Sequence, residues 1–185
     1  MAIKIFVKET DLFDDVNSRF IHIKPTVLNM EHSLIAISKW ESRYHLPFLV
    51  EEEKTAEQLE YYFECMTINQ NVDPNVYKAI SYEDQERILR YIKDPMTATT
   101  ISNGDDLRKG KGPRGEIVTS ELIYCWMVLA QVPSEYEKWH LNRLLTLIQV
   151  INAYNQPPKK VSLSDVIRNN DALNAKRRAK MHSRG

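Results

Sequence analysis

Glu137 and His140 have the Glu-x-x-His spacing, which could bring both side chains to one metal ion. Residues three apart project from one face of a helix, and di-iron bundles use this spacing to bring both side chains to the metal. Such sites also need a second copy of the motif and two further carboxylates. The sequence holds no second copy. We therefore expect a first-turn acid and a partly exposed imidazole here, and no metal or other cofactor.

A glycine-rich segment and two cysteines are the other residues that could do chemistry. Gly110–Gly115 resembles a phosphate-binding loop in composition, but it lacks the Walker spacing and the terminal Lys-Ser/Thr, so a solvated hairpin loop is expected. Cys65 and Cys125 both lie in apolar stretches, which indicates buried free thiols and a reducing compartment. With no nucleophile elbow and no Cys-x-x-Cys motif, the sequence predicts a protein that is not an enzyme.

Charge is divided unevenly along the chain. Residues 1–158 carry 17 Lys and Arg against 23 Asp and Glu, whereas residues 159–185 carry 8 against 2. The longest apolar run, Leu122–Ala130, is too short to span a bilayer, so no membrane insertion is expected. An acidic body with a basic tail indicates an anionic partner for the tail. That partner could be nucleic acid, or an acidic protein such as a neighbouring copy of this chain; a solvated tail is the third possibility.

The elements that would position these residues predict an α+β fold that is predominantly α-helical. Ile3–Lys8 and Phe20–Leu28 have strand patterns and are expected to pair. Capping residues then predict helices that begin near Ser33, Thr55, Asp73 and Ser81. Residues 96–119 predict a β-hairpin with a mobile basic loop.

Two helices are expected to form the centre of the domain. The first covers Leu122–Ala130, and because it is apolar all round it is expected to be buried, Trp126 included. The second is expected to run from the Ser134 capping box to Tyr154 and to bury one broad apolar face, leaving Asn142, Thr146 and Gln149 as a narrow polar ridge. The predicted domain covers residues 1–154.

A proline-containing linker at residues 155–160 is expected to lead to a basic C-terminal segment, residues 161–185. That segment predicts a helix of about fifteen residues whose apolar seam is too thin to hold it in place alone, so we expect it to be detachable and to order on a partner. Its candidate partner-binding residues are Val166, Leu173, Lys176, Arg177, Arg178 and Lys180.

An aromatic and aliphatic cluster surrounds the end of the helix that begins near Ser33. Its members are Trp40, Tyr44, Leu46, Phe48 and Leu49. The cluster could be ordinary core, or the edge of a groove that grips an amphipathic helix. Trp40, Tyr44, Phe48 and Leu49 are therefore candidate partner-binding residues.

Three segments resemble the tail assembly chaperones of long-tailed bacteriophages. They are Met30–Ser42 with Pro47-Phe48-Leu49, then Glu121–Met127 with Trp139–Ile148, and finally Ala172–Met181. The string Trp-His-Leu-Asn-Arg-Leu-Leu in the second segment is the most specific of these features.

The resemblance implies a non-enzymatic protein of the host cytoplasm. Proteins of this kind are thought to coat the helical tape measure protein until the tail tube polymerises around it, which implies grooves for amphipathic helices and a homo-oligomer. One alternative is a structural protein of the virion, in the tail, neck or baseplate. A second alternative is a nucleic-acid-binding protein that uses the basic tail. No aromatic residue lies between the basic residues of that tail, so stacking on single strands has little support.

Overall fold

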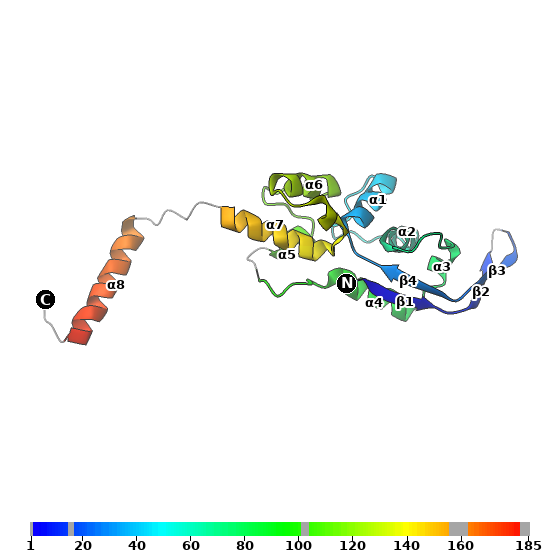
Figure 1. Cartoon of the computed structure of the whole chain (residues 1–185), viewed down its shortest axis with the longest axis horizontal. Helices are drawn as coiled ribbons and strands as arrows, with labels where there is room; N and C mark the ends of the chain where they lie inside the picture. Colours follow the sequence, from blue (N-terminus) through cyan, green and yellow to red (C-terminus); the bar gives the residue numbers. More distant parts are fainter. Residues whose placement is uncertain (1, 15–16, 101–103, 156–162, 182–185) are drawn as a thin grey trace. The chain divides into compact units, whose positions relative to one another are not determined.

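A computed structural model describes residues 2–14, 17–100, 104–155 and 163–181. The chain divides into two units, Met1–Ala153 and Tyr154–Gly185, which are described separately (Figure 1). The prediction of an α+β fold that is predominantly helical is confirmed. Within the described ranges, no helix combines the length and the apolar composition that crossing a bilayer requires.

The N-terminal strands form two antiparallel pairs. β1 (Ile3–Val7) pairs with β4 (Thr26–Met30), and β2 (Thr10–Asp14) pairs with β3 (Arg19–Ile23). The predicted pairing of the first strand is thus correct, but the strand expected over 20–28 is two strands that meet around Pro25, which has no N–H to donate to a ladder. The strand β2 was not predicted, because its two aspartates lower its apparent β-propensity.

The predicted helix starts at Ser33, Thr55 and Ser81 are confirmed. In α1 (Leu34–Tyr44) the Ser33 hydroxyl accepts from a backbone N–H in the first turn, and in α4 (Tyr82–Lys93) Ser81 does the same. In α2 (Ala56–Met66) both halves of the capping box form, with Thr55 and Gln58 as its members. The short α3 (Asn75–Lys78) follows Asp73, whose carboxylate accepts from the Asn75 backbone N–H at 2.9 Å.

The β-hairpin predicted over residues 96–119 is wrong. The described part of that segment contains a short helix, α5 (Gly104–Arg108), and a single β-bridge between Lys111 and Ile117. Gly110 has a φ of 74°, and a Cβ there would lie 3.1 Å from the backbone of Leu49 and Val50. The absence of a side chain at Gly110 therefore allows this turn to pack closely against the backbone of Leu49 and Val50.

The next two helices differ from the prediction in burial and in starting point. α6 (Ser120–Leu129) forms, but it buries only the side of Ser120, Ile123 and Met127, so the expectation of a wholly buried helix is wrong. Ser134–Lys138 is a 3₁₀ turn, η1, and α7 (Leu141–Asn155) begins only after His140 pairs with Ser33 in a β-bridge.

A buried carboxylate joins three segments of the core. Glu41, on α1, is 7% exposed, and its two oxygens accept from the backbone N–H groups of Phe48 (2.9 Å) and Ser120 (2.7 Å). These bonds fix the loop after α1 and the start of α6 to the same side chain. α1 also packs against α2 and α6, so it is the central helix of this part of the fold (Figure 1).

A second polar cluster joins the start of α7 to the end of α4. The Asn142 amide donates to the carbonyl oxygens of Ile92 and Asp94, at 3.0 and 2.7 Å. The Thr146 hydroxyl donates to the Asn142 carbonyl at 2.8 Å. Asn142 and Thr146 are both buried, so the polar ridge predicted on this helix lies in the interior at these two positions. Asn142 faces inward because the unpaired carbonyls at the end of α4 need donors.

The C-terminal unit contains α8 (Leu163–Met181), a helix of 19 residues. The predicted helix of about fifteen residues is therefore present and longer than expected. Residues 156–160 of the predicted linker lie outside the described residues, as do residues 161 and 162 of the predicted C-terminal segment.

Candidate partner-binding surfaces

Trp40 belongs to the hydrophobic core of the body. It is 1% exposed, its indole Nε1 donates to the Gln58 carbonyl at 2.9 Å, and its ring centroid lies 5.2 Å from that of Phe48. Of the two alternatives for Trp40, the structure favours core over groove edge. Removing this indole would leave a large cavity, so Trp40 variants report on folding rather than on partner binding.

Tyr44 and Phe48 continue this aromatic cluster. The Tyr44 ring packs against Trp40 at 4.9 Å, and burial raises the pKa of its hydroxyl. Phe48 is buried, and the Lys54 ammonium lies 4.7 Å from its ring centroid. Burial lowers the pKa of Lys54. Phe48 and Leu49 line a pocket to which Trp40 and Tyr44 do not contribute.

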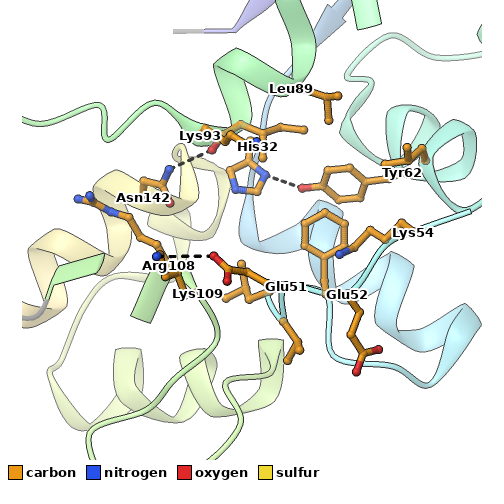
Figure 2. Close-up of a pocket in the computed structure, with 15 residues that line it drawn as sticks. His32, Glu51, Glu52, Lys54, Tyr62, Leu89, Lys93, Arg108, Lys109 and Asn142 are labelled. Atoms are coloured by element: carbon orange, nitrogen blue, oxygen red, sulfur yellow. Dashed lines mark hydrogen bonds and ion pairs between the residues drawn. The ribbon is translucent and has the colours of Figure 1, made fainter. Parts of the chain in front are cut away.

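That pocket, here called the loop pocket, has a volume of about 600 Å³ (Figure 2). Apolar side chains such as Leu59 and Ile92 form part of its lining. Charged side chains also line it, namely Glu51, Glu52, Lys54, Lys93, Arg108 and Lys109. Lys109 lies 3.7 Å from the Glu51 carboxylate. The mixture of apolar and charged groups suits an amphipathic ligand.

A histidine and a tyrosine make one wall of the loop pocket (Figure 2). The His32 Nδ1 and the Tyr62 hydroxyl are 2.5 Å apart, and both side chains are buried. Burial, and then the nearby His140 ring, hold the pKa of His32 well below its usual value. The imidazole is therefore neutral at neutral pH and acts as a buried hydrogen-bonding group.

Glu137 and His140, the two candidate metal ligands, form hydrogen bonds within the fold. The Glu137 carboxylate accepts from the Tyr124 hydroxyl at 3.0 Å. The His140 Nε2 donates to the Tyr91 carbonyl at 3.0 Å, so its Nδ1 accepts from the Asn142 backbone N–H. His140 is 3% exposed, so the expectation of a partly exposed imidazole is wrong. Among the described residues, no group of three or more His, Cys, Asp or Glu is placed to hold a metal ion.

The outer side of α6 carries an exposed apolar surface. Val128 and Leu129 are each 76% exposed, and Cys125 is exposed one turn earlier. Successive residues of a helix are rotated by about 100°, which places these three on the face opposite Ile123 and Met127. Exposed apolar groups gathered on one face commonly mark an interaction site.

A hollow at the N-terminal end of α6 extends this surface. Leu46 (45% exposed) and Ile117 (59%) line it, together with Glu121. We call Leu46, Ile117, Cys125, Val128 and Leu129 the α6 strip. The Glu121 carboxylate accepts from its own backbone N–H and from the Thr119 hydroxyl, which lowers its pKa and keeps it ionised. The strip thus has exposed apolar side chains at both ends of α6, and its N-terminal end also carries Glu121 and the polar lining residues Ser42, His45 and Thr119.

Sequence reasoning missed the α6 strip. It placed Cys125 and Trp126 in the core, but the Cys125 thiol is exposed and Trp126 is only half-buried; of the two cysteines only Cys65 is buried. One signal could have revealed the strip. α6 has ten residues and lacks a polar face, so any packing against one side leaves an apolar side outward.

The C-terminal candidates can be placed on α8. Leu173 is 52% exposed, and Lys176, Arg177, Arg178 and Lys180 are also exposed. The Val166 side chain lies outside the described residues, although its helical position is known. Because Val166, Leu173, Arg177 and Lys180 are separated by seven, four and three residues, they share one face of the helix. That face is apolar toward its N-terminal end and basic toward its C-terminal end.

Comparisons with known proteins add no relative. No protein-family model matches the chain, and neither a curated protein nor a solved structure matches it.

Proposed function

We propose that this protein is a tail assembly chaperone of a long-tailed bacteriophage, a non-enzymatic protein that binds amphipathic helices of the tape measure protein in the host cytoplasm. The α6 strip is the observation that carries the proposal. A chaperone of this kind needs an apolar surface that accepts helices of varying sequence. Val128 and Leu129 offer such a surface at the cost of exposing both side chains to water in the free protein.

The shape of the strip suits a helix. An amphipathic helix presents anchors at positions i, i+3, i+4 and i+7, and these spread over about two turns. The α6 face from Glu121 to Leu129 spans a similar length, with the hollow lined by Leu46 and Ile117 at one end. The strip therefore supplies the apolar contact that the family resemblance called for, at other residues than Trp40 and Tyr44.

Two other functions remain as alternatives. A structural role in the tail, neck or baseplate of the virion would use the same apolar surface, but permanently. Nucleic-acid binding would use the exposed bases of α8, and would weaken steeply as salt rises. The exposed apolar face of α6 favours a protein partner over nucleic acid, because phosphate contacts need no such face.

The test is co-expression of this chain with the tape measure protein of the same phage. We expect the soluble fraction of the tape measure protein to rise when the chain is present and the two proteins to co-purify. The matched control is co-expression with an unrelated acidic protein of similar size. If the tape measure protein precipitates equally in both cases, the chaperone function is wrong.

A further inference from the structure

We propose that the loop pocket binds a small free organic acid, in which one carboxylate is attached to an apolar body. The pocket shares no residue with the α6 strip, and the inference does not depend on the chaperone function. The pocket volume of about 600 Å³ lies within the range of about 300–1,000 Å³ that is typical of small-molecule sites. Its charge, one buried hydrogen-bond donor and an apolar wall together favour this class of ligand.

The charge of the loop pocket is opposite to that of the body around it. Residues 1–158 carry 23 acidic and 17 basic residues, whereas the pocket lining has four basic side chains and two acidic ones. Lys109 pairs with Glu51, but neither Lys54 nor Lys93 forms an ion pair with a described carboxylate. Ammonium groups in this position attract an anion. The two acidic side chains disfavour an anion of higher charge, which makes a carboxylate a better match than a phosphate.

Lys54 is held against the apolar part of the pocket. Its ammonium lies 4.7 Å from the ring centroid of Phe48 and 5.8 Å from that of Trp40. Burial lowers the pKa of Lys54, and the nearby Glu52 partly offsets this effect. A carboxylate bound beside the ammonium would favour its charged form and replace part of the hydration that burial removes.

His32 supplies a hydrogen-bond donor in the wall of the loop pocket (Figure 2). Its Nδ1 lies 2.5 Å from the Tyr62 hydroxyl, which has no other acceptor among the described residues. The hydroxyl therefore donates to Nδ1, and the proton of the neutral ring lies on Nε2. This N–H also has no acceptor among the described residues. Within the same residues only the Tyr44 hydroxyl is both sealed from solvent and unpartnered, so the His32 Nε2 is open to a ligand oxygen.

Much of the remaining lining is apolar and can cover the body of the acid. It comes from α2, from α4 and from the loop after α1, and its members include Leu59, Tyr62, Leu89, Ile92 and Phe48. Each CH₂ group that such a wall removes from water strengthens binding by about fourfold. A bare anion cannot use this wall, and an uncharged apolar molecule cannot use the ammonium groups.

Calorimetric titration of the purified full chain with octanoate tests the inference. Octanoate should bind. Octanamide keeps the apolar chain without the charge, and acetate keeps the charge without the chain, so each should bind at least tenfold more weakly than octanoate. Equal affinity for octanoate and octanamide contradicts the inference, and so does an absence of octanoate binding at millimolar concentrations.

Three lysine variants locate the binding site. Lys54→Met keeps an apolar side chain but removes the ammonium, so the affinity for octanoate should fall by about tenfold. Lys93→Met should also lower it, and because Lys93 is exposed this variant is informative even if Lys54→Met unfolds. The matched control is Lys78→Met, which removes an exposed lysine of α3 outside the pocket and should leave the affinity unchanged.

Two results with these variants would show that octanoate does not bind in the loop pocket. One is wild-type affinity in both Lys54→Met and Lys93→Met. The other is an equal loss in all three variants, which would reflect the net charge of the protein and not this site. Melting temperatures of the variants show whether each one is folded.

A protein chain end is the competing ligand, since it also joins a carboxylate to an apolar group. An N-acetylated tripeptide that ends in leucine is the probe. If the tripeptide binds at least tenfold more tightly than octanoate, the pocket recognises a polypeptide terminus and the free acid is wrong. Weaker binding of the tripeptide supports the free acid. A chain that binds octanoate but leaves the tape measure protein insoluble refutes the chaperone function alone, and the reverse result refutes this inference alone.

Discussion

Replacing Glu41 with glutamine should lower the free energy of unfolding by about 2–4 kcal/mol, because the change removes a charged acceptor from two buried backbone N–H groups. The Phe48 and Ser120 N–H groups both donate to this carboxylate. A glutamine can accept from only one of them, and its NH₂ group then faces the other donor. Urea denaturation of the purified full chain measures the effect.

The control for this prediction is Glu86→Gln on α4, where the side chain is exposed. Surface substitutions of this type usually change stability by no more than about 0.5 kcal/mol. If Glu41→Gln costs no more than Glu86→Gln, the buried carboxylate does not join α1 to α6 as described. A loss specific to Glu41 would show that this one side chain stabilises the attachment of the loop after α1 and the start of α6.

Replacing both Val128 and Leu129 with serine should abolish the rescue of the tape measure protein in co-expression. Each of these side chains is 76% exposed in the free protein, so the double variant should fold normally. Burying one such side chain against a partner contributes about 1.5–3 kcal/mol, so losing two weakens binding by on the order of a hundredfold or more. The soluble fraction of the tape measure protein is the measurement.

A matched control removes exposed apolar groups elsewhere. Ile68 is 60% exposed and Tyr82 76%, and neither lies on the α6 strip. The Ile68→Ser, Tyr82→Ser double variant should keep the full rescue. Equal loss in both double variants would mean that general surface hydrophobicity, and not this strip, supports binding. Wild-type melting temperatures in both variants would exclude unfolding as the cause.

Local signals in the sequence were enough to predict much of the helical framework. Ser33, Thr55 and Ser81 act through bonds to residues three positions ahead, so their effect depends little on the rest of the chain. The same holds for the strand alternation of Ile3–Val7. Features that depend on a distant partner were not predictable in this way.

The polar cluster around α7 shows why. The sequence predicted that Asn142 and Thr146 form a polar ridge beside the apolar face of the helix, and it gave no partner for either side chain. Asn142 is buried because the end of α4, about fifty positions earlier in the chain, presents carbonyl groups to its side-chain amide. The Thr146 hydroxyl in turn donates to the Asn142 carbonyl. The Trp-His-Leu-Asn string that supports the family resemblance contains His140 and Asn142. In this structure both bond to the end of α4, so the string has a role in the fold.

The candidate site was predictable only in part. Phe48 and Leu49 do line a pocket, and three of the C-terminal candidates, Leu173, Arg177 and Lys180, share one exposed face of α8. The α6 strip was missed because an apolar sequence does not say which of its sides the rest of the fold will cover. That choice depends on the packing of Ile123 and Met127 against the core.

The exposed thiol of Cys125 provides the most direct test of the central claim, that the outer face of α6 binds tape measure helices. Its rate of maleimide labelling should be compared in the free chain and in the co-purified complex, with the buried Cys65 as an internal reference. The account predicts that labelling of Cys125 slows severalfold in the complex and recovers when the tape measure protein is removed. An intact complex in which Cys125 reacts as fast as in the free chain would contradict it.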